Sequence, residues 1–383
     1  MTCLPFANAQ RILARTDATV IDLRSPAEFA VDHFPGAFNI PLFDNDQRAI
    51  VGTLYKQSSP SEAFAQGVEF VVDKIEQLVS EVGKLAKWEP PTDGAKEHVQ
   101  KMTAPGFDGF RSALKQAFDA PLPERPVAFY CWRGGMRSMS VIALMHAMGL
   151  ERVVGLERGY KGYRKHVMAE IADWQAPRSF ALRGLTGVGK TLVLREIESI
   201  RPGWTVDLEG LAGHRSSLLG SVGLHPVSQK TFESRVAQRL RAGFPGEVAV
   251  FEMESRKVGS IIVPEPVWKS LRAAKVFDVV ADTKHRVRVL REDYLGEDGS
   301  VQPLRVKLAE VEALVKPAQP LLELYDAERY DDVILALLKY HYDPLYRQSH
   351  GASPSARFRA EDCAKAAREM VDWIEADMGE EPS

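Results

Sequence analysis

The sequence predicts an α/β protein in which two parallel-sheet domains are followed by a helix-rich C-terminal part. Short apolar runs typical of buried strands alternate with helical patterns, which favours parallel sheets. A length of 383 residues is enough for two or three domains that each bury a core. The composition, with 45% hydrophobic and 26% charged residues, is that of a globular protein.

The first domain is expected over residues 8–168. It begins with a strand at Thr19–Arg24, and the sequence Ser25-Pro26-Ala27-Glu28 is typical of a helix start. Residues 60–120 have a helical pattern that is broken at Pro90-Pro91 and Pro105-Gly106. The other expected elements are strands at Phe38–Pro41, Val127–Tyr130 and Val153–Leu156, and helices at Ser138–Met148 and His166–Trp174.

The second domain is expected over residues 178–290, after a boundary at Gln175-Ala176-Pro177. A helix is predicted at Thr191–Ile200. The predicted strands are Phe180–Leu182, Trp204–Val206, Val248–Phe251 and Val276–Val280. Residues 291–383 are expected to form a helix-rich region packed on this domain, ending in a long helical pattern from Ala360 to Met378.

Composition argues against several classes of protein. The three cysteines, Cys3, Cys131 and Cys363, are too few and too scattered for a disulfide framework or a zinc cage. A net charge of -3 argues against a surface coated with phosphate-binding cations, so DNA is not an expected partner and any RNA must bind a local patch. No bilayer-spanning apolar stretch and no export signal are apparent, so we expect a cytoplasmic protein with no membrane partner.

A loop after the strand Val127–Tyr130 is the first candidate for chemistry. It reads Cys131-Trp132-Arg133-Gly134-Gly135-Met136-Arg137-Ser138 and leads into a helix. A strand-to-helix loop gathers backbone N–H groups and the positive end of the helix dipole around one point, and Arg133 and Arg137 add positive charge. Because such surroundings lower the pKa of a thiol, we predict that Cys131, Arg137 and Arg133 are catalytic. Cys3 and Cys363 are interpreted as residues without a catalytic role.

A second motif, Gly184-Leu185-Thr186-Gly187-Val188-Gly189-Lys190-Thr191, matches the eight-residue P-loop pattern between a strand and a helix. Its backbone N–H groups can converge on phosphate oxygens, and Lys190 can reach the outer phosphates. The predicted phosphate-binding residues are Gly184, Thr186, Gly187, Gly189, Lys190 and Thr191. The strand Val248–Phe251 ends in Glu252-Met253-Glu254. Thr191 and Glu252 are therefore candidate Mg²⁺ ligands, although a solvent-facing acid explains Glu252 or Glu254 equally well.

Three further segments suggest ligand binding. Asp207-Leu208-Glu209-Gly210 resembles the substrate-binding corner of small P-loop kinases. Arg286, Arg288 and Arg291 match either phosphate-clamping arginines or a solvated cationic helix face. Residues 158–166 interleave tyrosines with cations, so Tyr160, Lys161, Tyr163 and Arg164 are candidates for binding RNA by stacking and charge. The alternative is a solvated helix start that buries its two tyrosines.

The first domain resembles the rhodanese domain. The resemblance lies in Asp22-Leu23-Arg24, in Glu28-Phe29 and in the segment His33 to Pro41, and Cys131 falls where that family keeps its persulfide-forming cysteine. Many single-domain rhodaneses place the loop arginine five residues after the cysteine, whereas Arg137 is six after Cys131. That spacing is shared with cysteine phosphatases, so the loop alone leaves phosphatase chemistry open. Tyr130 stands where tyrosine phosphatases typically carry histidine.

The order of these parts is similar to that of the bacterial tRNA 2-selenouridine synthase family. Further matches are Val51 to Gln57, Gly159 to Arg164, Asp207 to Arg215, Ser228 to Glu233, and Tyr342 to Tyr346. Two segments depart from the expected pattern, with Met253 where an acid is expected and no glycine after His214-Arg215. The resemblance implies a rhodanese-like parallel-sheet domain followed by a P-loop NTPase-like α/β domain.

The resemblance also implies a reaction. In the family, 2-thiouridine at the wobble position is S-geranylated from geranyl diphosphate, and selenium from selenophosphate then displaces the geranylthio group. Cys131 would carry the selenium as a selenylsulfide. The implied partners are the anticodon region of tRNA and an enzyme that supplies selenophosphate. No tightly bound cofactor is implied beyond these co-substrates, with Mg²⁺ as a candidate ion.

Three other functions remain compatible with the residues. A small-molecule kinase with a regulatory rhodanese-like domain would need the P-loop but not Cys131. A cysteine phosphatase would act through Cys131 and Arg137. An adaptor that binds tRNA and relays persulfide sulfur would need no P-loop chemistry.

Overall fold

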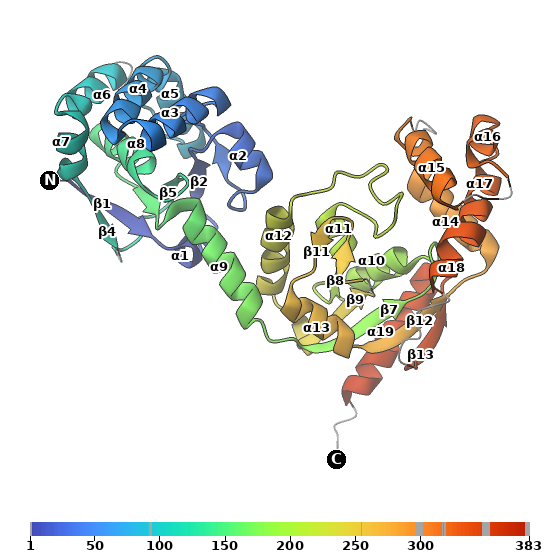
Figure 1. The fold of residues 1–383 in the computed structure, drawn as a ribbon. Helices are drawn as coiled ribbons and strands as arrows, with labels where there is room; N and C mark the ends of the chain where they lie inside the picture. The colour runs from blue at the N-terminus through green and yellow to red at the C-terminus, as the bar shows by residue number, and fades with distance from the viewer. Residues whose placement is uncertain are drawn as a thin grey trace. The chain divides into compact units, whose positions relative to one another are not determined.

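The computed structural model describes residues 2–91, 94–118, 120–253, 255–295, 302–315, 317, 319–346 and 353–379. The chain forms two compact units, Met1–Ala169 and Glu170–Ser383 (Figure 1). A parallel sheet runs through each unit, which confirms the predicted α/β class. Within the described ranges, no helix combines the length and hydropathy needed to cross a bilayer.

The sheet of the N-terminal unit has the order β3-β2-β5-β6-β1-β4, and all of its strand pairs are parallel. Its strands are β1 (Thr2–Ala7), β2 (Thr19–Asp22), β3 (Phe38–Asn39), β4 (Leu114–Phe118), β5 (Val127–Tyr130) and β6 (Val153–Leu156). Two of these strands were not predicted: β1 precedes the expected domain start at residue 8, and β4 falls in the region expected to be helical. Pro5 weakens the strand pattern of β1, and β4 is largely polar, so only their mutual pairing identifies them.

Helices cover both sides of this sheet. They are α1 (Ala9–Leu13), α2 (Pro26–Val31), α3 (Asn45–Gln57), α4 (Pro60–Val72), α5 (Ile75–Ala86), α6 (Ala95–Thr103), α7 (Gly106–Ala113), α8 (Met136–Ala147) and α9 (Gly159–Asp173). Figure 1 shows α3 to α8 on one side and α1 and α9 on the other. The expected breaks at Pro90-Pro91 and Pro105-Gly106 are confirmed. Helix α9 begins at Gly159 rather than at the expected His166, because a start rich in glycine has little helical pattern.

The sheet of the C-terminal unit has the order β13-β12-β7-β9-β8 and is parallel throughout. Its strands are β7 (Arg178–Arg183), β8 (Thr205–Val206), β9 (Val248–Glu252), β12 (Lys275–Val280) and β13 (Ala356–Arg359), and β10 (Lys257–Val258) with β11 (Ile261–Ile262) forms a separate hairpin. Its helices include α10 (Lys190–Ile200), α11 (Leu208–Ala212), α12 (Gln229–Arg241), α13 (Glu265–Ala273) and α19 (Cys363–Gly379). The strands expected between residues 180 and 280 are thus confirmed.

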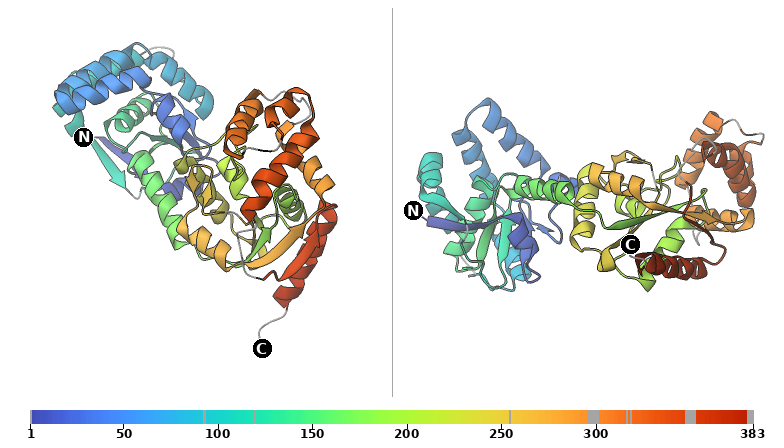
Figure 2. Two further views of the ribbon diagram at one scale, coloured as in Figure 1. Left: turned by 45° about the vertical axis from the view of Figure 1, so that its right-hand side comes forward. Right: turned by 90° about the horizontal axis from the view of Figure 1, so that it is seen from below.

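The last third of the chain contributes to two different cores. One is formed by α14 (Thr283–Leu295), α15 (Gln302–Val315), α16 (Leu321–Asp326), α17 (Tyr330–Leu337) and a π-helical turn (Leu338–Tyr342), together with Leu219 and Val222. The short helix α18 (Asp343–Tyr346) follows the π-helical turn. Strand β13 and helix α19 instead join the sheet and its core (Figure 2). The expected helical packing of residues 291–383 is therefore wrong at β13. Its sequence, Ala-Arg-Phe-Arg, buries only Phe358 at an edge and so lacks an apolar run.

Candidate active sites

The cysteine loop, residues 131–135, connects β5 to α8 at the carboxyl end of an interior strand. Cys131 Sγ lies 3.4 Å from Ser138 Oγ, and that hydroxyl donates to the Gly135 carbonyl at 3.1 Å. The cysteine is only 3% exposed, but it borders a cavity of about 670 Å³. A reactant can therefore reach the thiol from within the cavity.

The charge around this loop favours the thiolate. Burial raises the pKa of the Cys131 thiol, but the Arg137 guanidinium, the Ser138 hydroxyl and the backbone N–H groups of Arg133 and Ser138 together lower it further than burial raises it. The net pKa lies below the ordinary value for cysteine. The Arg137 side chain is partly exposed, with its Nη1 atom 3.9 Å from Glu28 Oε2. Cys131 and Arg133 thus lie on the loop, and Arg137 lies next to it in the first turn of α8.

Arg133 and Arg137 should differ in their effect on the pKa of Cys131. Because the Arg137 side chain supplies the charge, replacing Arg137 with Ala should raise the pKa of Cys131, and alkylation by iodoacetamide should then begin at higher pH. Replacing Arg133 with Ala should leave the pKa nearly unchanged, because that residue acts through its backbone N–H. The measurement is the alkylation rate of Cys131 against pH, followed by peptide mass spectrometry. Equal shifts in the two variants would contradict this assignment.

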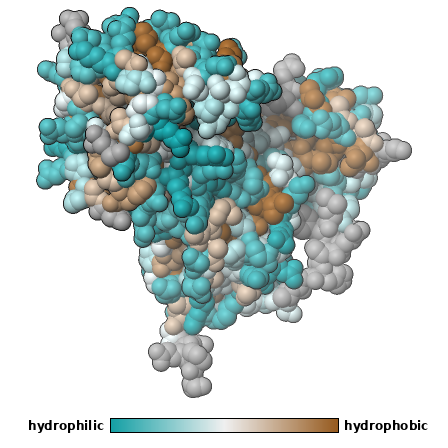
Figure 3. Space-filling model, turned by 60° about the vertical axis from the view of Figure 1, so that its left-hand side comes forward, coloured by the Kyte–Doolittle hydropathy of each residue, from teal (hydrophilic) through white to brown (hydrophobic). Residues whose placement is uncertain are grey.

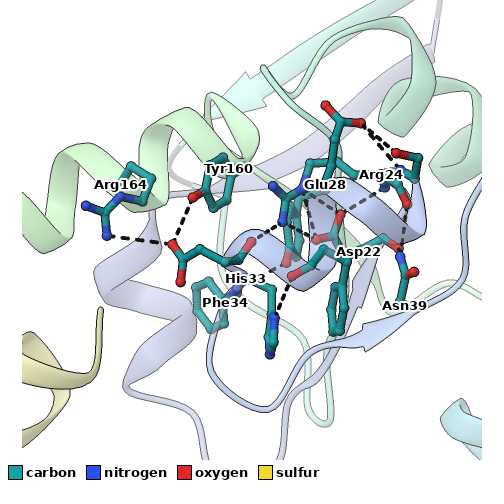
Figure 4. Close-up of polar contacts among 12 residues, drawn as sticks. Asp22, Arg24, Glu28, His33, Phe34, Asn39, Tyr160 and Arg164 are labelled. Atoms are coloured by element: carbon teal, nitrogen blue, oxygen red, sulfur yellow. Dashed lines mark hydrogen bonds and ion pairs between the residues drawn. The ribbon is translucent and has the colours of Figure 1, made fainter. Parts of the chain in front are cut away.

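A buried ion pair, Asp22 with Arg24, lies at the end of β2 (Figure 4). Arg24 Nη2 donates to Asp22 Oδ2 at 2.6 Å and to the Asp32 carbonyl at 2.7 Å, and the Asp22 and Arg24 side chains are 0% and 1% exposed. The Arg24 guanidinium also lies 3.8 Å from the centre of the Tyr160 ring. Asn39 donates from its amide to the backbone carbonyls of Asp22 and Arg24. These contacts tie the end of β2 to the start of α9.

The start of α9 holds the cysteine loop. The backbone N–H of Tyr160 donates to the Cys131 carbonyl at 2.9 Å, and that of Lys161 donates to the Trp132 carbonyl at 3.1 Å. Gly159 has a φ of +56°, and a Cβ there would lie 2.2 Å from the Cys131 carbonyl oxygen, so only glycine fits. The segment predicted to bind RNA therefore supports the reactive loop.

This packing corrects the predicted RNA-binding role of Tyr160 and Tyr163. Their rings are 2% and 0% exposed, so neither can stack on a base. The Tyr160 hydroxyl donates to Asp32 Oδ2 at 2.8 Å, and burial together with Asp32 raises the pKa of Tyr160, which keeps this hydroxyl protonated. Arg164 also faces Asp32, with 3.6 Å between Nη1 and Oδ2, whereas Lys161 is exposed. The alternative of a helix start that buries its tyrosines is the one observed.

Breaking the buried ion pair should strongly destabilise the N-terminal unit. Replacing Arg24 with Met leaves the buried Asp22 carboxylate without its partner, which should cost about 3–5 kcal/mol in the free energy of unfolding. The control is Arg15→Ala, which removes the partly exposed pair with Asp17 and should have a far smaller effect. Urea denaturation of both variants provides the measurement. Similar losses of stability would show that the pair has no special role.

The phosphate loop lies between β7 and α10, as the motif predicts. Gly189 has a φ of +93° at the N-cap of α10, a backbone conformation suited to glycine. Lys190 is 9% exposed, and its Nζ donates to the Gly184 carbonyl at 3.2 Å. The Thr186 carbonyl accepts from Arg286 Nε at 2.8 Å. The predicted phosphate-binding residues therefore form one continuous loop at a helix N-terminus, where phosphate binding is expected.

Glu252, at the end of β9, faces this loop. Its Oε2 accepts from Thr191 Oγ1 at 2.9 Å, and its Oε1 lies 3.7 Å from Lys190 Nζ. Burial raises the pKa of Glu252, the Lys190 charge opposes the rise, and Glu209 and Asp207 add to it. The predicted partnership of Thr191 and Glu252 is therefore present, and its two oxygens suit a hard cation. Glu254, the other candidate acid, lies outside the described residues.

All three arginines suggested as phosphate-clamping residues contact other side chains of the protein. Arg286 is buried and pairs with Asp343, with Nη2 and Oδ1 2.6 Å apart. Arg291 pairs with Asp331 at the surface, and Arg288 contacts the His285 ring. Arg286 therefore supports the phosphate loop by donating to the Thr186 carbonyl. Asp343, from the segment Tyr342 to Tyr346, pairs with Arg286 from the other side.

Two features of this site were not predicted from the sequence: the Asp22–Arg24 pair as a support of the cysteine loop, and the cavity beside Cys131. Opposite charges two residues apart at the end of a buried strand were a signal for the pair. The cavity had no such signal, because its wall comes from helices scattered over residues 45–144.

Comparisons with known proteins identify the family. A model of the tRNA 2-selenouridine synthase AAA domain matches residues 178–303. A tRNA 2-selenouridine synthase of Cupriavidus necator is 30% identical over 96% of this chain and 96% of its own length. Proteins of the same name from Hydrogenovibrio crunogenus and Nitrosomonas europaea are 28% and 26% identical, over 85% and 94% of this chain and 88% and 95% of their own lengths. With the cysteine loop and the phosphate loop in one chain that matches these relatives almost end to end, the protein belongs to the tRNA 2-selenouridine synthase family.

Proposed function

We propose that this protein converts 2-thiouridine at the wobble position of tRNA to 2-selenouridine through an S-geranylated intermediate, using geranyl diphosphate and selenophosphate. The observation that carries the proposal is the presence, in a member of this family, of a thiol with a lowered pKa and a separate phosphate loop. These two sites suit the two halves of the reaction. The proposed location is the cytoplasm.

The phosphate loop suits the first step. In it, the sulfur of 2-thiouridine attacks C1 of the geranyl group, the C–S bond forms, and the C–O bond breaks as diphosphate leaves with the electron pair. In this proposal the backbone N–H groups of the loop and Lys190, at the N-terminus of α10, stabilise that negative charge. The Thr191 and Glu252 oxygens are the proposed ligands of a Mg²⁺ ion, which would neutralise diphosphate charge.

The cysteine loop suits the second step. The Cys131 thiolate attacks the selenium of selenophosphate, so the S–Se bond forms and the Se–P bond breaks as phosphite leaves with the electron pair. The terminal selenium then attacks C2, the C2–Se bond forms, and the C2–S bond breaks as geranylthiolate leaves and takes up a proton. An external thiol finally cleaves the S–Se bond, which releases 2-selenouridine and oxidises the two thiols to a mixed disulfide with Cys131. S-alkylation prepares the sulfur for this departure, since a thiolate leaves more readily than sulfide. Cys131 is the proposed carrier of the selenium, and Arg137 and Arg133 supply positive charge for the anionic donor.

We further propose that tRNA binds with its anticodon region at these loops and that a separate enzyme supplies selenophosphate. Cations rather than stacked tyrosines are the proposed RNA contacts near α9. Lys161 and Lys165 are exposed there, at the first two turns of the helix. Their charge would attract phosphates without distinguishing sequence.

Mass spectrometry of tRNA nucleosides tests the proposal. Incubation of the full chain with 2-thiouridine tRNA and geranyl diphosphate should yield S-geranyl-2-thiouridine, and addition of selenophosphate with a thiol reductant should convert it to 2-selenouridine. Absence of both products would contradict the proposed function. Phosphoryl transfer from ATP that survives Cys131→Ala would favour a kinase, and Cys131-dependent hydrolysis of an aryl phosphate would favour a phosphatase. Persulfide transfer alone would favour a sulfur-relaying adaptor.

A further inference from the structure

The cavity beside Cys131 is large and is built mainly by one segment of the chain. Its volume of about 670 Å³ falls in the range of about 300–1,000 Å³ that is usual for small-molecule sites. Helices α3 to α7, residues 45–113, supply most of the wall, and the cysteine loop, α8 and the residues Leu42 and Phe43 before α3 supply the rest. This helical segment therefore forms a pocket at the reactive thiol.

The wall of the cavity is mostly apolar. Representative side chains are Val51 from α3, Phe64 and Val68 from α4, Met102 from α6, and Phe107 and Phe110 from α7. No Asp or Glu among the described residues lines it. The outer face shown in Figure 3 is mainly hydrophilic, with apolar residues in small separate patches. A wall of this kind favours a ligand that has a substantial hydrocarbon part.

Positive charge lies where the cavity meets the cysteine loop. Arg48 of α3 and Arg137 both face Glu28, at distances of 3.5 and 3.9 Å, so these two arginines lie near each other. Both line the cavity, as do Lys56 and Arg133. An apolar chamber that opens beside a thiol and several cations suits a hydrocarbon chain attached to an anionic nucleotide.

We propose that this cavity binds the geranyl chain of the S-geranylated tRNA nucleotide while C2 of its base lies beside Cys131. This inference rests on the proposed function. Within that reaction, the geranyl chain is the one part of the substrates without a hydrogen-bonding group, so it is the part that an apolar wall binds best. The cavity thereby distinguishes the alkylated base from 2-thiouridine. Selenium is then delivered only to a base whose C2 carries the geranylthio leaving group.

Protection of Cys131 from iodoacetamide tests the binding directly. The full chain is alkylated in the presence of S-geranyl-2-thiouridine or S-methyl-2-thiouridine nucleoside, and modification of Cys131 is followed by peptide mass spectrometry. The geranyl nucleoside should slow alkylation at least tenfold at a concentration at which the methyl nucleoside has no effect. Equal protection by the two nucleosides would overturn the proposal.

Variants of α3 and α4 locate the site. Val51→Trp and Val68→Trp each place a bulky ring in the cavity wall, so protection by the geranyl nucleoside should be lost. The matched control is Ile50→Trp, which changes the exposed residue next to Val51 that does not line the cavity, and protection should persist. Two variants are used so that the test still holds if one of them misfolds. Thermal unfolding shows whether each variant is folded. Undiminished protection in both folded variants would overturn the assignment.

Turnover of tRNA separates this inference from the proposed function. With thiolated tRNA and both co-substrates, the filled variants should accumulate S-geranylated tRNA and form 2-selenouridine at least tenfold more slowly. If they form 2-selenouridine at the rate of the unaltered protein, the cavity assignment fails while the proposed function stands. If the unaltered protein forms no product but shows geranyl-specific protection, the proposed function fails instead. If geranyl diphosphate protects Cys131 and the filled variants lose the intermediate, the cavity serves the first step and the proposal is wrong.

Discussion

Replacing Cys131 with Ser should lower the rate of 2-selenouridine formation by at least about 10³-fold, the scale expected when a reacting nucleophile is lost. The reason is the ionisation of the side chain. The surroundings lower the pKa of the thiol, so the thiolate forms at a lower pH than in an ordinary cysteine, whereas a serine hydroxyl in the same place stays protonated. S-geranylated tRNA should accumulate, since its formation is assigned to the phosphate loop. Nucleoside mass spectrometry measures both species.

The other two cysteines provide the control for this prediction. Cys3 is exposed on β1 and Cys363 begins α19 in the other unit, and neither borders the cavity. Cys3→Ser and Cys363→Ser should retain 2-selenouridine formation. Product at the unaltered rate in Cys131→Ser would remove the catalytic assignment of that thiol.

Replacing Lys190 with Ala should lower formation of the geranylated intermediate by on the order of 10²–10³-fold. The Lys190 ammonium lies at the N-terminus of α10, beside the loop that is assigned to diphosphate. Without this cation, the charge that develops on the departing diphosphate loses its strongest nearby partner. The variant should still convert S-geranylated tRNA, supplied ready made, to 2-selenouridine. The rate of each half-reaction is the measurement.

An exposed lysine of the same unit is the control. The Lys269 side chain, on α13, is 75% exposed and pairs with Glu265, so Lys269→Ala should geranylate tRNA normally. Removal of Lys190 also takes away the charge that opposes the raised pKa of Glu252, so thermal unfolding of Lys190→Ala must be compared with that of the unaltered protein. A folded Lys190→Ala that geranylates at the normal rate would contradict the role of this loop.

Features that depend only on residues close together in the chain could be predicted from the sequence. The strands Val127–Tyr130 and Val153–Leu156 were predicted with their observed bounds, because all four residues of each are buried and such strands appear as unbroken apolar runs. The phosphate loop was also predictable, since a complete motif followed a strand and opened a helix.

Features that depend on distant partners were not predictable in this way. Strand β4 looks helical in isolation and becomes a strand through pairing with β1, more than 100 residues away in the chain. Tyr160 and Tyr163 have the composition of an RNA-binding patch, but the buried carboxylate of Asp32 and the packing under the cysteine loop turn them inward. Strand β13, at the edge of the sheet, has too few buried residues to be recognised from its own pattern.

The sequence by itself therefore determined the α/β class, the two reactive loops and the family resemblance, because each of these is encoded in contiguous residues whose spacing sets the local backbone. Only the tertiary structure decided the lowered pKa of Cys131 in its buried position, the partnership of Glu252 with Thr191, and the apolar cavity. The physical reason is that electrostatic fields and cavities depend on distances between atoms, and folding brings together groups from helices and strands that lie far apart in the chain.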